Sequence, residues 1–447
     1  MSSTTGVAVR RNRLWLVAIA CFIVSFVPYC YLEIPCYPNS GDNFWYVPTA
    51  LSILQHGDID LARYSDAVGQ IPPWEGWMPV MDQDPRVLKV GAARYGLFPL
   101  GTALASLPIV AAGSFLHDQD NVMRKCLVIS RYTAAIWASF SVVLLFVLLF
   151  MLTGKTAASA LLSFVFAFAT PHYSIHHNGL WSHNVYIPFL LLALILMVWR
   201  EGRFICYAAI PLAMGYIIRP DSISVIALTA AYVALTHRRA LIPFIAMGGC
   251  IALLFTAWSW YQYGLIVPPY YSAGRLNFTH FREAVVANLG SPNRGLFVFV
   301  PLFFFSVYGA GLAFQHKGSY HGLYRLAAVA VFVHWLLISM LPHWWGGFSY
   351  GPRLFCAVLP FFVILLVPVL DECRVCSPVR RVLLGIGMLL CLCWSIFVQV
   401  RGVTDERVYA WNGLPNVDLH PEQVWSWGDM QILRGMTGGP PPPIDPL

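Results

Sequence analysis

The sequence predicts an all-α polytopic membrane protein with about 11 transmembrane helices. Hydrophobic residues make up 58% of its 447 residues and charged residues only 11%, whereas a soluble domain carries roughly 25% charged residues. Apolar stretches recur from residue 14 to residue 400, and the polar segments between them are mostly short. We therefore expect one transmembrane domain over residues 1–400 rather than soluble modules on an anchor.

The first apolar stretch, "LWLVAIACFIVSFVPYCYL", follows Arg10, Arg11 and Arg13. It is too long for a secretory signal and no small-residue cleavage site follows it, so we expect a retained first helix. Several candidate spans are shorter than the ~20 residues that cross the hydrocarbon core, so their ends should border a cavity or a thinned region. The candidate spans are approximately 14–32, 130–153, 157–171, 184–199, 204–218, 221–236, 240–260, 296–314, 323–341, 354–371 and 382–400.

The segment "GLFPLGTALASLPIVAAGSFL", residues 96–116, is long enough to cross the membrane but contains two prolines and two interior glycines. If it crossed, the basic short loops that follow would all face outward, against the positive-inside rule. We therefore predict a re-entrant or surface-lying helix pair inside a long first outer loop, residues 33–129. The juxtamembrane helices of this loop belong to the transmembrane domain.

The predicted orientation places the N-terminus in the cytoplasm and most acidic residues on the outer face of a cell (inner) membrane. Polar chemistry is then expected on the periplasmic or extracellular side. Basic residues at cytoplasmic helix ends account for the net charge of +7, so we expect membrane lipids and no nucleic acid as partners. Residues 401–447 form a short outward-facing segment, whose end "TGGPPPPIDPL" we expect to be disordered.

An acidic stretch follows the first span. Apolar residues at helical spacing from Phe44 to Leu54 predict a helix in the headgroup region, with Asp42 at or just before its N-terminus. Asp42 could be the N-cap of that helix, a general base for a hydroxyl acceptor, or both. Asp58 and Asp60 in "HGDIDL" form a D-x-D pattern, but we predict mainly turn and cap roles for them.

The predicted second outer loop, "TPHYSIHHNGLWSHN", contains His172, His176, His177 and His183. The first two are four residues apart, a spacing that suits zinc ligands on a helix, but the loop holds no Cys and no carboxylate. We therefore predict no metal site. Hydrogen bonds from one or two of these histidines to a phosphate or a sugar, or helix capping, are favoured instead.

Three further outer stretches combine basic and aromatic residues: "PPYYSAGRLNFTHFRE", "GSPNRGLFVFVP" and "PHWWGGFSYGPRLF". Guanidinium groups bind phosphate oxygens in a forked geometry, and aromatic faces stack on sugar rings. Snorkelling arginines in an interfacial aromatic belt are the alternative for each stretch. Because all three share a face with the acidic loop, we predict an anionic headgroup site containing Arg275, Arg294, His343, Tyr350 and Arg353.

Arg219 and Asp221 in "IIRPDS" lie between two short spans. Charges at such a depth need a partner or a watery cavity. The two residues therefore either pair with each other or line the site, and the sequence leaves both possibilities open.

The series of motifs resembles that of the GT-C superfamily of polytopic glycosyltransferases, particularly the bacterial relatives of protein O-mannosyltransferases and aminoarabinose transferases (glycosyltransferase family 39). The resemblance covers about residues 14–370. It rests on the order of its pieces, which are Gly41-Asp42-Asn43, "GDIDL", "ARYGLFPLGTALASLPIV", "LWSH", "IIRPDS", "SPNRGLFVFVP" and "WWGGFSYGPRLF".

The resemblance implies transfer of a sugar, with inversion, from a polyprenyl-phosphate donor to an envelope lipid, glycan or protein on the outer face. It implies Asp42 as the base and no cofactor beyond the donor lipid. It also implies that Arg294 or Arg353, with help from His343, holds the donor phosphate.

The chain departs from many relatives, which have Asp-Glu at Asp42-Asn43 and a carboxylate in the second outer loop. Metal-dependent members use that second carboxylate, so its absence predicts a metal-independent enzyme. Whether His177 or His183 contacts the substrate in its place stays open.

Two other function classes fit the sequence less well. A lipid-linked sugar flippase or transporter would need charged residues near the bilayer midplane and preferably paired halves, whereas the acids here cluster in outer loops. A phosphoethanolamine or acyl transferase would need a Ser or Thr nucleophile with a metal, or a buried catalytic His, for which the loop histidines are a weak signal.

Overall fold

The computed structural model describes residues 2–31, 43–65, 84, 86–116, 122–177, 179–315, 318 and 320–436, with the backbone alone for 2–13, 31 and 273. This part of the chain is mostly helical, as predicted, apart from one two-stranded hairpin. The helices and strands are α1 (Ser2–Tyr31), α2 (Tyr46–His56), β1 (Val87–Val90), β2 (Ala93–Gly96), α4 (Gly101–Leu116), α5 (Val122–Thr153), α6 (Thr156–Phe168), α7 (Pro171–His176), α8 (Ser182–Val198), α9 (Ala209–Ile218), α10 (Ile223–Thr236), α11 (Arg238–Tyr263), α12 (Phe281–Gly290), α13 (Leu296–Phe299), α14 (Phe303–Gln315), α15 (His321–Ser339), α16 (Leu359–Ile364), α17 (Leu366–Val375), α18 (Pro378–Thr404) and α19 (Glu406–Ala410).

Within the described residues, five helical segments are long and apolar enough to cross a membrane, and further apolar helices are shorter. In α11 and α18 only 11% and 17% of the most apolar stretch is buried inside the protein. Leu253 and Leu254 on α11, and Leu389 and Leu390 on α18, are exposed. Apolar faces of this extent suit hydrocarbon rather than water, so the chain is a multi-pass membrane protein in its general architecture. The number of crossings stays a prediction.

Three of the predicted spans are interrupted. The first breaks between α6 and α7, where Thr170 Oγ1 accepts a hydrogen bond from His172 N (3.2 Å) and Pro171 occupies the first helical turn. The second breaks between α13 and α14 near Pro301, and the third begins as a 3-10 turn over Arg353–Val358 before α16. Irregular backbone at this depth is tolerated where protein or water surrounds it, and α16 is buried along its whole length.

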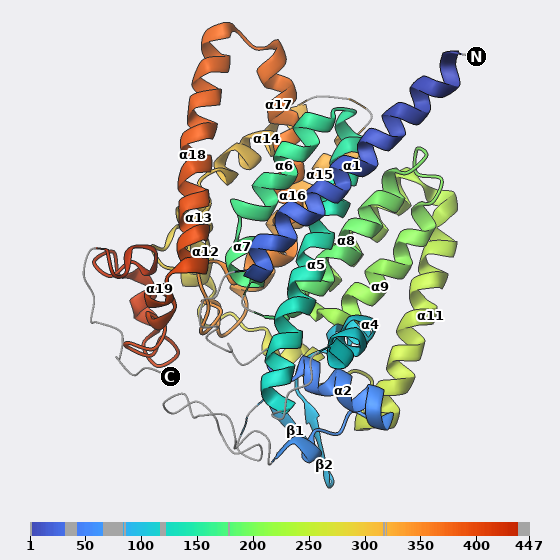
Figure 1. The fold of residues 1–447 in the computed structure, drawn as a ribbon, viewed down its shortest axis with the longest axis vertical. Helices are drawn as coiled ribbons and strands as arrows, with labels where there is room; N and C mark the ends of the chain where they lie inside the picture. The colour runs from blue at the N-terminus through green and yellow to red at the C-terminus, as the bar shows by residue number, and fades with distance from the viewer. Residues whose placement is uncertain are drawn as a thin grey trace.

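One end of the helix bundle, here called the α2 end, carries α2, α4 and the hairpin (Figure 1). The N-cap position of α2 belongs to Trp45 and not to Asp42, which lies outside the described residues. The helix ends at Gly57, whose φ of 74° and N–H···O bond to Ile53 (3.0 Å) form a left-handed cap.

The apolar face of α2 packs into the protein. Val47 and Leu51 belong to the main hydrophobic core, and only Leu54 of the predicted apolar stripe is exposed. The predicted helix is therefore confirmed, and protein covers most of its apolar face. Its position in the headgroup region stays a prediction. The periodic pattern was correctly assigned to a helix, but a helical stripe has the same spacing whether protein or lipid covers it.

Residues 96–116 form the end of β2 and a single helix, α4, instead of the predicted helix pair. The hairpin turns at Gly91, which has a φ of 61°. Figure 1 shows α4 nearly end-on while α5 runs along the bundle, so α4 lies across the α2 end. The first turn of α4 touches the backbone of α9, because a Cβ on Gly101 would be 2.5 Å from Ile217 O.

Residues 405–436, here called the C-terminal segment, fold against the end of the bundle beside the end of α18 (Figure 1). A small apolar cluster joins this segment to α12 and to the loop after α15. Its buried members are Ala284, Ala287, Trp344, Trp345, Trp411, Val417 and Val424. The part of the predicted region 401–447 that the structure describes is therefore a packed element.

Candidate functional site

Motif stretches far apart in the sequence meet at the α2 end. The side chain of Asn43, the residue after the predicted base, lies against Gly179: a Cβ on Gly179 would be 2.7 Å from Asn43 Nδ2. Gly179 has a φ of 124°, which favours glycine. Two residues later the indole ring of Trp181 faces Arg353, with 4.6 Å between the guanidinium carbon and the ring centroid. The motifs that contain Asn43, Trp181 and Arg353 are therefore neighbours in space.

Arg219 and Asp221 form an ion pair with two hydrogen bonds, from Nη2 to Oδ2 (2.5 Å) and from Nε to Oδ1 (3.0 Å). The third guanidinium nitrogen, Nη1, donates to Ser182 Oγ at 2.9 Å. Burial opposes the charge of Arg219, but the carboxylate outweighs this effect and the pKa of the guanidinium is raised. Of the two possibilities left open by the sequence, pairing is confirmed, and the Ser182 contact also places the pair beside the second motif.

His176 and His183 are buried, and neither ring nitrogen of either residue has a hydrogen-bond partner within the described part of the chain. Their ring centroids are 6.2 Å apart. Burial, followed by the neighbouring His172 and Arg219, lowers the pKa of His176. An unpaired buried polar group costs about 1–3 kcal/mol, so these nitrogens are suited to a polar ligand or to water.

Arg353 ends a turn-rich stretch, residues 343–353, here called the Trp-Gly loop. Gly346, Gly347 and Gly351 in this loop have φ values of 78°, 63° and 62°. A Cβ on Gly346 would be 3.5 Å from Arg353 Nε, so the loop wraps closely around the arginine. Positive φ at three positions explains why the motif "WWGGFSYGPR" is rich in glycine.

Arg294 does not have the role predicted for it. The side chain is 1% exposed and donates all five of its N–H groups to protein oxygens: Trp345 O (2.7 Å), Asn293 O (2.8 Å), Gln431 Oε1 (2.8 Å), Gly347 O (3.2 Å) and Asn412 Oδ1 (2.7 Å). No donor is left for a phosphate. Burial and the charge of Arg353 lower the pKa of this guanidinium, and its five bonds offset that cost.

Tyr350 is also a structural residue. It is 1% exposed, and its hydroxyl donates to Val398 O at 2.8 Å. His177 is 5% exposed and bonds Tyr29 O through Nδ1 (3.2 Å), which ties the predicted second outer loop to α1. The hydroxyl of Tyr350 is therefore already bonded to protein, which does not fit a substrate contact, whereas the question of a substrate contact by His177 stays open.

Arg275 and His343 are exposed. The guanidinium of Arg275 lies 3.9 Å from the centroid of the Tyr270 ring and donates to Tyr270 O (3.2 Å). The ring of His343 packs on Trp345 with centroids 5.0 Å apart. These contacts place Arg275 on Tyr270 and His343 at the start of the Trp-Gly loop.

Asp58 and Asp60 have the contacts expected of turn residues. Asp58 accepts from Ser52 Oγ (2.7 Å) and pairs with Arg63 (2.7 Å). Asp60 Oδ1 accepts from the backbone N–H groups of Ala62 (3.0 Å) and Arg94 (2.9 Å), which joins the turn to the hairpin. The hydrogen bond from Ser52 is the largest influence that lowers the pKa of Asp58.

A pocket at the α2 end lies between α2, the hairpin, α4 and α11. Its empty volume is about 370 Å³, part of it open to solvent, and its aromatic wall is made by Trp45, Tyr46, Phe98 and Tyr263. Leu100 and Ala103 in its lining flank Gly101, on which a Cβ would be 2.8 Å from Ile218 N. The pocket therefore adjoins the residue before Arg219.

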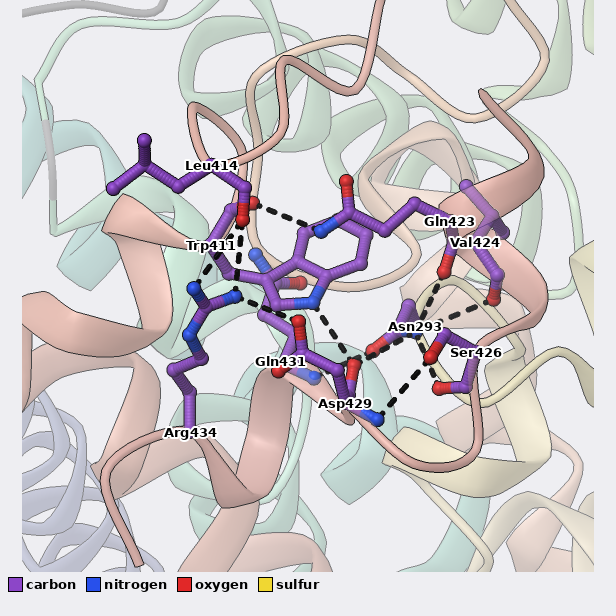
Figure 2. A network of polar contacts seen from close by, with 9 residues as sticks. All are labelled: Asn293, Trp411, Leu414, Gln423, Val424, Ser426, Asp429, Gln431 and Arg434. Atoms are coloured by element: carbon purple, nitrogen blue, oxygen red, sulfur yellow. Dashed lines mark hydrogen bonds and ion pairs between the residues drawn. The ribbon is translucent and has the colours of Figure 1, made fainter. Parts of the chain in front are cut away.

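Sequence reasoning missed the residues that hold the C-terminal segment. Figure 2 shows the amide nitrogen of Asn293 pointing at the carbonyl groups of Gln423, Val424, Ser426 and Asp429, at 3.1 to 3.4 Å, while Asn293 Oδ1 accepts from Gln431 N (2.5 Å). Asn293 stands in the quoted motif "SPNRG", directly before Arg294, the residue to which the sequence assigned phosphate binding. Nothing in the sequence near Gln431 signals its role.

Among the described residues, no group of three or more His, Cys, Asp or Glu side chains could hold a metal ion. The metal-independent reaction stays a prediction. No protein-family model matches the chain, and a search of curated proteins finds no significant match. The site itself is thus the basis for the function proposed below.

Proposed function

We propose that this protein is an integral-membrane glycosyltransferase, which moves a sugar from a polyprenyl-phosphate donor to a cell-envelope acceptor on the outer face of the inner membrane. The observation that carries the proposal is the meeting of Arg353, His183 and the Arg219–Asp221 pair at the α2 end. Arg353 stacks on Trp181, and Arg219 bonds Ser182, the residue before His183. Arginine side chains, together with imidazole nitrogens that have no hydrogen-bond partner among the described residues, suit the binding of a phosphate group carried by a lipid.

In this proposal Arg353 and His183 hold the phosphate of the donor, and Arg294 holds the loop instead. Arg219 is already paired with Asp221, so its charge contributes less to the binding of an anion. The aromatic wall of the adjoining pocket suits a sugar ring, because aromatic faces stack on the apolar faces of sugars. The lipid tail of the donor keeps the reaction at the membrane boundary.

The reaction is a displacement at the anomeric carbon. A bond forms between the acceptor oxygen and that carbon while the bond from the carbon to the phosphate oxygen breaks, and configuration inverts. The phosphate leaves with the electron pair, and Arg353 stabilises its negative charge. The acceptor proton passes to the carboxylate of Asp42, which is the proposed general base.

The proposal is tested by mass spectrometry of envelope lipids and glycans from cells that carry the wild-type protein, Asp42→Asn, Arg353→Ala or no protein. We expect a hexose, pentose or amino-sugar modification that is present with the wild type and lost in the other three. Arg282→Ala, a change at an exposed arginine on α12, is the matched control and should keep the modification. Identical envelope sugars with and without the wild-type protein would contradict the proposal.

The turnover rate of Asp42→Asn distinguishes a general base from a structural capping residue. Loss of a general base lowers the rate about 10²–10⁴-fold with little change in melting temperature. Full turnover with a lower melting temperature would show that Asp42 is a structural residue.

A further inference from the structure

The side chain of Gln431 joins the C-terminal segment to the Trp-Gly loop. Gln431 is fully buried, its Oε1 accepts from Gly351 N (3.2 Å), and its Nε2 donates to Ser349 O (3.0 Å). Both contacts are made to backbone groups within four residues of Arg353. A residue 78 positions further along the chain therefore fixes the backbone that leads into Arg353.

Arg294 holds the first half of the same loop through hydrogen bonds. Its Nε and Nη2 groups donate to Trp345 O and Gly347 O, while Nη1 donates to the Gln431 Oε1 that also receives Gly351 N. Arg294 and Gln431 thus form one connected set of hydrogen bonds along the loop. Asn293 completes the set by accepting Gln431 N, as Figure 2 shows.

The loop needs this support, because its own sequence does not favour one conformation. Three glycines with positive φ interrupt any regular hydrogen-bond pattern, and glycine loses more conformational entropy on ordering than other residues. The loop is also closely packed, since a Cβ on Gly351 would be 2.4 Å from the Phe299 ring. The conformation is therefore determined by contacts from outside the loop.

The five acceptors of Arg294 are carbonyl and amide oxygens, and none of them is a carboxylate. A carboxylate would neutralise the guanidinium, whereas neutral acceptors satisfy its donors and leave its positive charge intact. Arg294 lies close enough to Arg353 for the two charges to interact. Because the carboxylate of Asp418 acts on the same guanidinium in the opposite sense, the role of Arg294 is positional: it holds the loop without contacting the phosphate.

We infer that Gln431 and Arg294 are positioning residues for Arg353, so that the C-terminal segment determines how tightly the donor phosphate is bound. The inference rests on the proposed function for its phosphate ligand. It goes beyond that proposal because the C-terminal segment, outside the predicted transmembrane domain, then controls the position of Arg353. The loop contacts can also be tested without any ligand.

The experiment compares Gln431→Ala with the wild type in lipid nanodiscs, using two measurements. Hydrogen exchange of residues 343–353 reports the order of the loop, and titration with polyprenyl phosphate reports its affinity for the site. We expect faster exchange in the loop and an affinity weakened about 10-fold or more, since a misplacement of about 1 Å commonly costs up to two orders of magnitude.

The matched control is Gln423→Ala. Gln423 lies in the same segment and is buried, but its side chain donates to Trp411 O (3.3 Å), within the C-terminal segment itself. This variant should lower the melting temperature by a similar amount while the exchange of the loop and the affinity stay at the wild-type values.

Two results would overturn the inference. Unchanged loop exchange in Gln431→Ala would show that Gln431 does not hold the loop, and faster exchange with unchanged affinity would show that the loop does not set phosphate binding. If the wild type binds no polyprenyl phosphate, the proposed function fails. Loop exchange still decides in that case whether Gln431 positions Arg353.

Discussion

The backbone of Gly179 lies in contact with the side chain of Asn43, so that a Cβ on the glycine would be 2.7 Å from Asn43 Nδ2. This contact joins the predicted second outer loop to the residue that directly follows Asp42. It places the residue after the proposed base beside the motif that also carries Trp181 and His183.

Gly179→Ala should lower sugar transfer at least about 10-fold, because the new methyl group displaces Asn43, the residue next to the proposed base in the sequence. The measurement is the initial rate with a polyprenyl-phosphate sugar donor. Gly249→Ala on α11, where a Cβ meets open space, should retain the rate. The double variant Gly179→Ala/Asn43→Ala should recover part of it, and a double variant no faster than Gly179→Ala would contradict the steric explanation.

Trp181→Leu should weaken donor binding, because it removes the aromatic face under Arg353. A cation–π contact contributes about 0.5–2 kcal/mol, so the KM for the donor should rise about 2- to 30-fold with little change in kcat. Trp181→Phe keeps a ring and should lie between the wild type and Trp181→Leu. An equal KM for all three proteins would rule out a contribution of the ring to donor binding.

The stability of the protein should fall as the pH falls from about 6.5 towards 4, partly through His177. Burial, with a smaller effect of Arg131, lowers the pKa of His177 to about 4, whereas the unfolded side chain titrates near 6.5. The unfolded state therefore binds a proton first, and stability that is complete above about pH 6.5 is lost as the pH falls through this window.

His177→Gln should reduce this loss by up to about 3 kcal/mol, the value of the pKa difference between the folded and unfolded states. The amide can still donate to Tyr29 O but takes up no proton in this range. Melting temperatures between pH 4 and pH 7.5 provide the measurement, with His56→Gln at an exposed position as the control. Parallel pH curves for His177→Gln and the wild type would contradict the assignment.

Gly351→Ala should destabilise the protein by about 2–4 kcal/mol, since the methyl group meets the Phe299 ring and alanine strains at a φ of 62°. Gly290→Ala at the end of α12, where a Cβ meets open space, should change stability by less than about 1 kcal/mol. Chemical unfolding of both variants in detergent is the measurement. Similar stability of the two variants would show that the loop adapts to the methyl group.

The local pattern of the chain was sufficient for some elements and insufficient for others. The helix predicted from Phe44 to Leu54 was found as α2, two residues later. The hairpin before α4 was missed because "VLKVGAARYG" is short and lies beside a much stronger apolar signal. The predicted spans around Pro171 and Pro301 were read as continuous, although each proline interrupts the helix there.

For the proposed site, the sequence singled out motifs that the structure brings together: Trp181 lies against Arg353, and Arg219 bonds Ser182, the residue before His183. That these residues form a substrate site stays a prediction. Tyr350 and Arg294 belong to equally polar or aromatic motifs and are structural residues. Asp42, on which the proposed chemistry depends, lies outside the described residues.

Composition and periodicity by themselves determined that this is a helical membrane protein, because a charge content this low and apolar stretches this long have no other stable arrangement. Only the tertiary structure decided that protein acceptors occupy every donor of Arg294. Arg294 and Arg353 both stand beside glycine and aromatic residues in the sequence. Four of the five acceptors of Arg294 come from residues 51 to 137 positions away, so the role of this guanidinium depends on distant partners rather than on its neighbours in the chain.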